Sequence, residues 1–348
     1  MRSSSSLGPL RIAEIAPVAS AVGPDATGSI ESLVWSLCER LQERGSRVTL
    51  FATADSVTRA TLRAHYALGY DREDGPWDWR LTEGLHAAAA FAAADDFDIV
   101  HCHTIYGLPF ALRCRAPTVV THHTEIGPEV VEAHLRLPTA EVVCASRAHA
   151  GRLNDLPRVH VINHGIDFDA FGLGDGGGEL LYLGRLIADK GPVQAIEIAR
   201  AAGRPIVLAG SAENNDDDYD DAIAPMVDGV MVRYLGAVDA AERTQLLARA
   251  GALVYPLQYP EPFGLVLAEA MACGTPVLAH PVGAVPEIVT EGENGFTSLT
   301  VEGLAALVPA ALALDRARIR AGARERFDLE RMVTRYETLF RRCARAEV

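Results

Sequence analysis

The chain has 348 residues, 49% of them apolar and 22% charged, which fits a soluble globular protein of two domains. Its 32 Lys and Arg against 46 Asp and Glu give a formal net charge of -14. This balance disfavours nucleic acid as the main partner and disfavours, without excluding, an anionic membrane surface. No apolar run reaches the roughly 18–20 residues that cross a bilayer.

Two features of the sequence favour a cytoplasmic protein. Residues 1–8 lack the apolar centre of a secretory signal, so we expect a short disordered lead. The six cysteines show no close-paired spacing, and most lie in apolar segments. We therefore expect buried free thiols in a reducing cytoplasm.

The first half alternates short apolar strands with helical segments, the pattern of a doubly wound parallel sheet. Strands are expected at residues 11–16, 47–52, 98–101, 118–121, 141–144 and 159–162. Helices are expected at about residues 31–44, 85–94, 130–137 and 146–153. Gly45 follows the first helix at the place of a C-cap glycine.

A glycine-rich stretch at residues 163–178 reads as the connection between two domains. The second half repeats the alternation, with strands expected at residues 180–183, 205–209, 230–235, 252–255, 276–279 and 296–299. The helical residues from 301 onward have no strand after them. The halves share an architecture without visible sequence repetition, which predicts an α/β protein of two doubly wound sheets.

Two glutamates eight positions apart, Glu261 and Glu269, carry the most specific functional signal. Pro262 suits a helix start, so we expect Glu261 just before a helix and Glu269 inside it. At ~1.5 Å rise per residue the carboxylates lie roughly 10–12 Å apart and flank unpaired helical N–H groups that bind anions. A nucleotide-sugar has its parts in the same order: sugar, diphosphate, ribose. A hydrolytic acid/base pair is the alternative, although glycosidase carboxyls lie ~5–10 Å apart.

Two cations follow the expected strand at residues 180–183. Gly184-Arg185 opens a loop that reaches Lys190-Gly191 and a further helix. Ligands of open parallel sheets bind at the carboxyl ends of strands, and both cation types bind phosphate. Ordinary surface cations are the alternative for each residue singly, but the combination with the two glutamates favours a diphosphate site.

The pattern Gly-Arg-x4-Lys-Gly followed by Glu-Pro-Phe-Gly-x4-Glu-Ala-Met-Ala-x-Gly-x-Pro-Val resembles the retaining glycosyltransferases of family 4, in their bacterial form. The similarity runs from Arg11 to about Arg341. It implies the GT-B fold, with two Rossmann-like doubly wound parallel-sheet domains facing across a cleft. The implied division is an acceptor-side domain at 1–164, a donor-binding domain at 165–328, and a last helix at 329–348 that packs back on the N-terminal domain.

The resemblance also implies the reaction and its partners. A hexose-type sugar moves from a nucleoside-diphosphate sugar to a hydroxyl group of a small-molecule acceptor, with retention, by a front-side mechanism and without a metal or other cofactor. A homodimer is compatible with the family. Identity of the sugar, the base and the acceptor does not follow from the sequence.

The resemblance gives roles to residues of the second half. Arg185 and Lys190 would hold the diphosphate, Glu261 the sugar hydroxyls and Glu269 the ribose. The donor-binding surface would further include Gly184, Phe263, Gly264 and Leu265.

Residues of the first half match the family less closely. Thr121-His-His123-Thr resembles a strand end that places His123 at the reaction centre, and Asp98-Ile-Val-His101-x-His103 resembles a strand on the acceptor side. Gly28 and Ser29 stand where the family has a Gly-Gly turn near the donor, so the second glycine is missing, and loop 17–28 is the candidate for acceptor recognition. Zinc held by three of His101, His103, His122 and His123 is the alternative.

Other functions stay open beside this one. A nucleotide-sugar epimerase or phosphorylase would share the fold, and a non-catalytic nucleotide-sugar binding protein would share the donor site. An acidic run at residues 214–221 resembles a calcium loop but lacks its glycine and final glutamate. A dinucleotide oxidoreductase is disfavoured, because no Gly-x-Gly-x-x-Gly follows the first strand.

Overall fold

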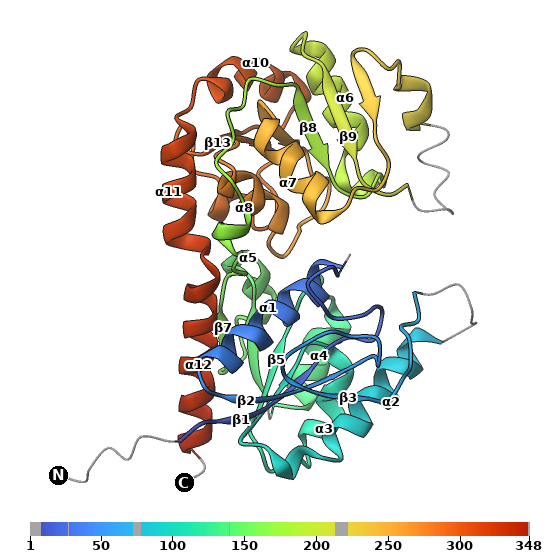
Figure 1. The fold of residues 1–348 in the computed structure, drawn as a ribbon, viewed down its shortest axis with the longest axis vertical. Helices are drawn as coiled ribbons and strands as arrows, with labels where there is room; N and C mark the ends of the chain where they lie inside the picture. Colours follow the sequence, from blue (N-terminus) through green and yellow to red (C-terminus); the bar gives the residue numbers. More distant parts are fainter. Residues whose placement is uncertain (1–7, 27, 72–77, 139, 213–221, 347–348) are drawn as a thin grey trace, which may run out of the picture. The chain divides into compact units, whose positions relative to one another are not determined.

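The computed structural model describes residues 8–26, 28–71, 78–138, 140–212 and 222–346. Residues 1–7 of the expected lead and the acidic run 214–221 lie outside this part of the chain. The chain divides into two compact units (Figure 1). The N-terminal unit contains Met1–Gly165 and Leu329–Val348, and the C-terminal unit contains Ile166–Asp328.

The N-terminal unit is built on a parallel seven-stranded sheet in the order β3-β2-β1-β4-β5-β6-β7. Its strands are β1 (Arg11–Ile15), β2 (Arg47–Ala52), β3 (Thr61–Ala64), β4 (Ile99–Cys102), β5 (Thr118–Thr121), β6 (Glu141–Cys144) and β7 (Val159–Val161). Its helices are α1 (Ser29–Glu43), α2 (Trp79–Phe91), α3 (Leu108–Ala111), α4 (Pro128–Arg136), α5 (Arg147–Ala150) and α12 (Leu329–Ala346). The central strands are buried throughout, because helices cover both faces of such a sheet.

The edge strand β3 is absent from the strands expected from the sequence. Its sequence Thr-Leu-Arg-Ala carries one large apolar residue, and most of the strand is exposed. No burial pattern therefore marks it. It forms through backbone pairing with β2, where Thr49 lies opposite Thr61 and Ala52 opposite Ala64.

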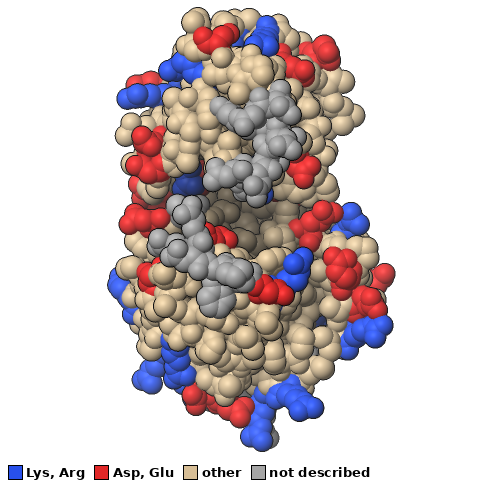
Figure 2. Space-filling model, turned by 90° about the vertical axis from the view of Figure 1, so that its right-hand side faces the viewer, with Lys and Arg blue, Asp and Glu red and all other residues tan. Residues whose placement is uncertain are grey.

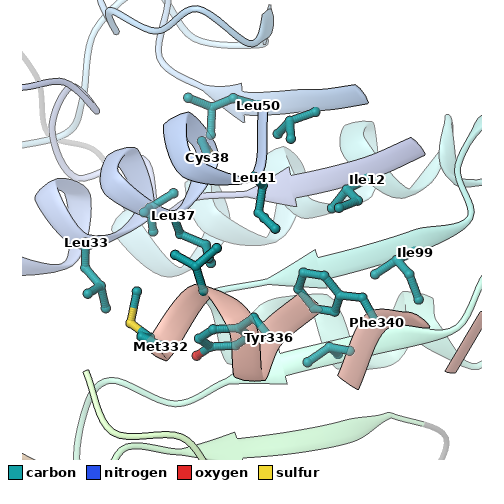
Figure 3. Packing of buried hydrophobic residues seen from close by; sticks show 14 of the residues in the cluster. Ile12, Leu33, Leu37, Cys38, Leu41, Leu50, Ile99, Met332, Tyr336 and Phe340 are labelled. Atoms are coloured by element: carbon teal, nitrogen blue, oxygen red, sulfur yellow. The ribbon is translucent and has the colours of Figure 1, made fainter. Parts of the chain in front are cut away.

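The last helix, α12, packs on the N-terminal unit. Its buried residues recur every three or four positions and form one apolar stripe. Figure 3 shows Met332 and Tyr336 of this stripe near Leu33 and Leu37 of α1, and Phe340 near Ile99 of β4. Residues far apart in the sequence thus share one core.

The C-terminal unit has a parallel six-stranded sheet in the order β10-β9-β8-β11-β12-β13. Its strands are β8 (Leu180–Leu183), β9 (Ile206–Ala209), β10 (Val232–Tyr234), β11 (Ala252–Tyr255), β12 (Val277–Ala279) and β13 (Gly295–Thr297). Its helices are α6 (Pro192–Ala201), α7 (Ala240–Arg249), α8 (Leu265–Ala272), α9 (Val285–Ile288), α10 (Val301–Leu312) and α11 (Arg316–Phe327). Both sheets confirm the expected α/β class with two Rossmann-like units.

Three further observations bear on class and partners. None of the described helices is long and apolar enough to cross a membrane. Five cysteine thiols are buried, namely those of Cys38, Cys102, Cys144, Cys273 and Cys343. On the face shown in Figure 2, the described Lys and Arg side chains are interspersed with Asp and Glu and do not gather into one basic patch.

Candidate active site

Each sheet has a point at which the strand order reverses. In the N-terminal unit β1 lies between β2 and β4, and in the C-terminal unit β8 lies between β9 and β11. Ligands of open parallel sheets bind outside the carboxyl ends of strands at such switch points. Gly184 follows β8, Glu261 lies in the loop after β11, and His103 follows β4. Residues expected to be functional therefore lie beside the switch point of each unit.

A glycine brings the loop after β8 against the chain after β11. Gly191 has φ +73°, and a Cβ atom there would lie 2.1 Å from the backbone oxygen of Pro256. In addition, the backbone N–H of Gln258 donates to the carbonyl of Asp189, 2.9 Å away. Only glycine tolerates both the left-handed backbone and this approach. The two loops are thereby joined at Lys190.

Lys190 and Glu261 contact each other directly. The Lys190 Nζ atom lies 2.5 Å from Glu261 Oε1 and donates to the Tyr259 hydroxyl at 2.9 Å. The Tyr255 hydroxyl donates to Glu261 Oε2 at 2.8 Å. Lys190 is buried and the Glu261 side chain is only 17% exposed. We define Lys190, Tyr255, Tyr259 and Glu261 as the Lys–Glu cluster.

The two tyrosines of the cluster remain proton donors. Burial, followed by the nearby Glu261 carboxylate, raises the pKa of the Tyr255 phenol well above its ordinary value. The same two causes raise the pKa of the Tyr259 phenol. Their hydroxyl groups therefore keep their protons at neutral pH. Neither tyrosine was singled out from the sequence, although both lie within six residues of Glu261.

Arg185 belongs to the surroundings of this cluster. It is exposed, and its backbone carbonyl accepts a hydrogen bond from the Tyr182 hydroxyl at 2.7 Å. The positive charge of Arg185 acts against the rise in the pKa of Tyr259. Two cations and one carboxylate of the predicted set thus lie beside the same switch point.

Helix α8 begins later than expected. The sequence predicted a start at Pro262, whereas the helix begins at Leu265 with Gly264 as its N-cap in the left-handed region, φ +85°. Gly264 has no side chain with which to cap, and the Leu267 N–H donates to the Gly264 carbonyl at 3.0 Å, so the N–H groups of Leu265 and Val266 are the ones suited to an anion. The Phe263 side chain is buried against Phe327, with ring centroids 5.6 Å apart. Only the backbone of Phe263 can therefore contribute to a donor site.

Glu269 has a partner that the sequence analysis missed. It is buried on α8, and its Oε1 atom lies 3.4 Å from Arg243 Nη1 on α7. Burial raises the pKa of the Glu269 carboxyl, and the charge of Arg243 opposes this rise. Glu269 contacts a different cation from the one that Glu261 contacts.

A chain of hydrogen bonds joins the predicted histidines of the N-terminal unit to Glu14 of β1. Glu14 Oε2 lies 2.8 Å from His101 Nδ1 and 3.0 Å from His103 Nε2. His103 Nδ1 lies 2.9 Å from His123 Nε2. His101 Nε2 lies 2.8 Å from Thr121 Oγ1. We call Glu14, His101, His103 and His123 the histidine chain; Glu14 was not foreseen, although a carboxylate in an apolar strand is itself a signal.

The rings of this chain are neutral at physiological pH. Burial lowers the pKa of His101 to about 3, and burial followed by the neighbouring His101 lowers the pKa of His103 to about 4. Burial, followed by four nearby histidines, also places the pKa of His123 well below its usual range. Burial raises the pKa of the Glu14 carboxyl, and its hydrogen bond from His103 opposes this rise.

The residues that could hold zinc differ from the set expected from the sequence. His122 lies outside the histidine chain, because its Nε2 atom contacts His134 Nε2 at 2.6 Å. Glu14, His101 and His103 do bring three ligand atoms together. Of these three atoms, His103 Nε2 is hydrogen-bonded to Glu14 and His101 Nδ1 has no hydrogen-bond partner among the described residues, while Thr121 and His123 contact the remaining ring nitrogens. A metal at this place would displace the hydrogen bond between Glu14 and His103.

The turn at Gly28 and Ser29 contains a carboxylate. Gly28 is the N-cap of α1 and Ser29 is exposed. A Cβ atom on Gly28 would lie 1.9 Å from Glu31 Oε2, so the buried Glu31 folds back over this glycine. Glu31 therefore lies where a ligand would approach the turn, and the donor contact of Gly28 stays a prediction.

Loop 19–26 lines a cavity of about 510 Å³ in the N-terminal unit. Its other walls come from Asp55, Val57, Gly69 and Asp71. The cavity lies beyond the ends of β1 and β2, near the switch point. A second cavity, of about 430 Å³, is lined by Leu10 and Pro117, which precede β1 and β5, and therefore lies at the amino ends of the strands. Position therefore favours the first of these for a substrate.

Comparisons with known protein families match both halves of the chain. A model of group 1 glycosyl transferases matches residues 166–326, and a model of glycosyltransferase family 4 matches residues 30–170. Glycogen synthase of Mycobacterium tuberculosis is 31% identical over 320 residues, which cover 85% of this chain and 76% of the relative. The D-inositol 3-phosphate glycosyltransferase of Xylanimonas cellulosilytica is 30% identical over 368 residues, with 87% and 88% covered.

Solved structures share the fold over nearly the whole chain. Sucrose-phosphate synthase from Thermosynechococcus elongatus has a TM-score of 0.77 at 20% identity, with 97% of this chain and 100% of that chain covered. AviGT4, a glycosyltransferase involved in avilamycin A biosynthesis, has a TM-score of 0.75 at 23% identity, with 97% and 98% covered. Anabaena Alr3699/HepE in complex with UDP and glucose has a TM-score of 0.73 at 21% identity, with 95% and 99% covered.

Proposed function

This chain belongs to glycosyltransferase family 4 and has its GT-B fold, and from that membership we propose a specific reaction. The protein transfers a hexose-type sugar from a nucleoside-diphosphate sugar to a hydroxyl group of a small-molecule acceptor. The configuration at the sugar is retained and no metal takes part. The observation that carries the proposal is the Lys–Glu cluster at the C-terminal switch point.

The cations of the C-terminal unit suit a departing diphosphate. Lys190 is held by Tyr259 and Glu261, and Arg185 lies on the same loop. Negative charge grows on the diphosphate as its bond to the sugar breaks. Fixed cations in a site with little water stabilise that charge more than water does. These two side chains would supply the charge that a metal ion provides in metal-dependent transferases.

Glu261 suits the sugar rather than the phosphate. Its carboxylate is rigid, because Lys190 and Tyr255 each contact one of its oxygens. A carboxylate oxygen has two acceptor sites; Oε1 already faces Lys190 and the Tyr259 hydroxyl, whereas Oε2, which accepts from Tyr255, can also accept a hydrogen bond from a sugar hydroxyl. The first N–H groups of α8, only four residues further along the chain, suit the diphosphate.

The chemical step needs no enzymic nucleophile. The acceptor oxygen forms a bond to the anomeric carbon on the face from which the diphosphate leaves, and the bond between that carbon and the phosphate oxygen breaks. The acceptor proton passes to the departing phosphate oxygen. A covalent glycosyl-enzyme trapped on any carboxylate would contradict this front-side course.

The N-terminal unit would bind the acceptor. The cavity at loop 19–26 has the volume of a small-ligand site. His123 would contact substrate hydroxyls near the reacting carbon, as the family resemblance implies. Two relatives are named for glucan and inositol-phosphate substrates, but the residues described here do not select between such acceptors.

The first experiment is a thermal-shift screen with nucleoside diphosphates and their sugars. A ligand at about 100 times its Kd stabilises the folded state by roughly 2.7 kcal/mol. We expect one nucleotide class to raise the melting temperature, and the double variant Arg185→Ala, Lys190→Ala to lose that shift. Arg233→Ala is the matched control, because Arg233 lies in the same unit and pairs with Glu179 on the surface.

The second experiment separates transfer from the rival functions. The selected donor is incubated alone and then with a panel of hydroxyl-bearing acceptors, and the products are analysed by mass spectrometry. Transfer predicts a new glycoside that requires an acceptor and persists in a chelator. A changed sugar from the donor alone indicates an epimerase, and binding without any product indicates a non-catalytic protein.

A further inference from the structure

The buried carboxylate of Glu14 has no role in the reaction proposed above. Its side chain is fully buried within β1, at the N-terminal switch point. The described side chains that contact it are two neutral histidine rings, those of His101 and His103. No lysine or arginine among the described residues forms an ion pair with it. A carboxylate buried in this way is costly, which calls for a reason.

The protonation state of Glu14 decides which nitrogen of the His103 ring carries a proton. His103 Nε2 forms a hydrogen bond with Glu14 Oε2 at 3.0 Å, whereas His101 Nδ1 lies 2.8 Å from the same oxygen without hydrogen-bond geometry. An ionised carboxylate can only accept, so an ionised Glu14 requires that His103 donates from Nε2. Since a neutral imidazole has one N–H group, His103 Nδ1 is then an acceptor.

The same reasoning carries the polarity to His123. His103 Nδ1 lies 2.9 Å from His123 Nε2 and can only accept there, so His123 donates from Nε2. The remaining nitrogen, His123 Nδ1, then bears a lone pair. This atom is buried and has no hydrogen-bond partner among the described residues. An acceptor atom without a donor is suited to a hydroxyl group of a ligand.

The ring of His123 is held so that this acceptor cannot turn away. It stacks on His103 with ring centroids 5.2 Å apart and an interplanar angle of 22°. It also stacks on His164, with ring centroids 5.3 Å apart and an interplanar angle of 26°. The position of Nδ1 is therefore defined by two neighbouring rings in addition to the hydrogen bond.

A second branch holds the His101 ring beside Glu14. The Tyr336 hydroxyl of α12 lies 3.0 Å from Thr121 Oγ1, which lies 2.8 Å from His101 Nε2. His101 Nδ1 and Glu14 Oε1 are buried without a hydrogen-bond partner among the described residues, so His103 provides the hydrogen bond to Glu14.

We propose that Glu14 is ionised and acts as a positioning residue: through His103 it holds His123 in the Nε2–H tautomer, so that His123 Nδ1 accepts a hydrogen bond from a substrate hydroxyl group. The hydroxyl-bearing ligand rests on the proposed glycosyl transfer. The tautomer does not, because it depends only on the charge of Glu14 and on contacts within the N-terminal unit.

The tautomer is measured directly by long-range ¹H–¹⁵N NMR on the full chain labelled with ¹⁵N-histidine at neutral pH. His123→Gln identifies the His123 signals by their loss. We expect the wild type to show protonated Nε2 and unprotonated Nδ1 at His123. A signal of the opposite tautomer, with the proton on Nδ1, overturns the proposal without any assay of activity.

Variants of Glu14 test the cause. Glu14→Leu removes the acceptor, and we expect His123 to become a mixture of tautomers. Glu14→Gln keeps an acceptor oxygen of the same shape and should retain more of the wild-type signal. Glu39→Leu is the matched control, since Glu39 is also buried in this unit but pairs with Arg59 and Thr58. An unchanged His123 tautomer in folded Glu14→Leu overturns the proposal; if this variant does not fold, Glu14→Gln and the wild-type spectrum decide.

Kinetics then separate positioning from mere stability. With the donor found by the thermal-shift screen, Glu14→Leu should lose about 10- to 100-fold in kcat, the usual cost of removing a residue that orients a functional histidine. The thermal shift caused by nucleoside diphosphate should not change, because that ligand binds the C-terminal unit. Equal kcat in Glu14→Leu and the wild type contradicts the positioning role. A wild type without transfer activity but with the expected tautomer contradicts the proposed function and leaves the Glu14 inference standing.

Discussion

At the carboxyl ends of β8 and β11 a lysine contacts a glutamate directly, whereas at the ends of β1 and β4 a lone carboxylate is surrounded by neutral histidine rings. Both places are switch points of parallel sheets. The first offers positive charge and N–H groups, which suit a diphosphate. The second offers one ring nitrogen, His123 Nδ1, without a hydrogen-bond partner among the described residues, and an acidic cavity nearby, which suit hydroxyl groups. Topology thus sets where a ligand binds, and the side chains set which ligand binds.

The largest expected effect comes from removing the cation of the C-terminal site. Lys190→Ala should lower kcat by about 10²–10³, because a fixed donor to the developing charge is lost. Steady-state transfer kinetics measure the loss. Arg233→Ala should stay near the wild-type rate, and a Lys190→Ala variant of normal activity would remove the basis for assigning the diphosphate to this unit.

Next comes the glycine that joins the two loops. Gly191→Ala should lower the free energy of unfolding by more than the about 1–2 kcal/mol of a left-handed backbone, because its Cβ would also clash with the Pro256 carbonyl. Denaturant unfolding measures this. Gly203→Ala is the matched control, with φ +63° and no atom within 4 Å of an added Cβ. Equal losses in the two variants would show that the contact with Pro256 is unimportant.

A smaller effect distinguishes sugar binding from phosphate binding at the same cluster. Glu261→Gln keeps the shape but weakens a charged acceptor, and loss of one such hydrogen bond is worth about 1.5–3 kcal/mol, or roughly 10- to 100-fold in kcat/KM. Binding of the nucleoside diphosphate alone should be kept or strengthened, because a negative charge beside Lys190 is removed. Calorimetry with the nucleoside diphosphate tests the expected binding, and kinetics with the sugar donor test the expected loss in kcat/KM. A joint loss of both would place Glu261 on the phosphate.

The last effect concerns acid stability and falls on the N-terminal unit. Burial is the main cause that lowers the pKa of six of its histidines to about 3 or 4, namely His86, His101, His103, His122, His134 and His164. Below pH ~6.5 the unfolded chain binds protons that these folded rings do not, so stability falls as the pH falls toward 4. Each excess proton contributes about 1.4 kcal/mol per pH unit.

Carboxyl groups of the same unit oppose part of this dependence. Burial raises the pKa of Glu83 to about 7 and also raises those of Glu14 and Glu31, so these groups favour the folded state at low pH. The histidines outnumber these carboxyl groups, so the free energy of unfolding of this unit still decreases as the pH falls.

The C-terminal unit lacks this cause of acid sensitivity. His280 is the one histidine of residues 166–328. All three tryptophans lie in residues 1–165, so tryptophan fluorescence should report unfolding at a higher pH than circular dichroism of the whole chain does. If fluorescence and circular dichroism report unfolding at the same pH, the N-terminal unit is not the more acid-sensitive of the two.

Local pattern was sufficient for most of the fold. Apolar runs marked, within two residues, twelve of the thirteen strands found in the described part of the chain, because a strand buried on both faces must be apolar along its length. The exception, β3, is an exposed edge strand that forms by backbone pairing. Pro262 was wrong as the start of α8, because the left-handed Gly264 delays the helix to Leu265.

The candidate site, too, could be predicted from the sequence only in part. The sequence by itself determined the family, the two sheets and the chemical types at each switch point, because these depend on residue order and on short-range periodicity. Only the tertiary structure decided that Lys190 touches Glu261, that Arg243 pairs with Glu269, and that Glu14 contacts His103, which contacts His123. Those contacts join residues from separate strands and loops, and their distances depend on how close two backbones pack, which no local pattern encodes.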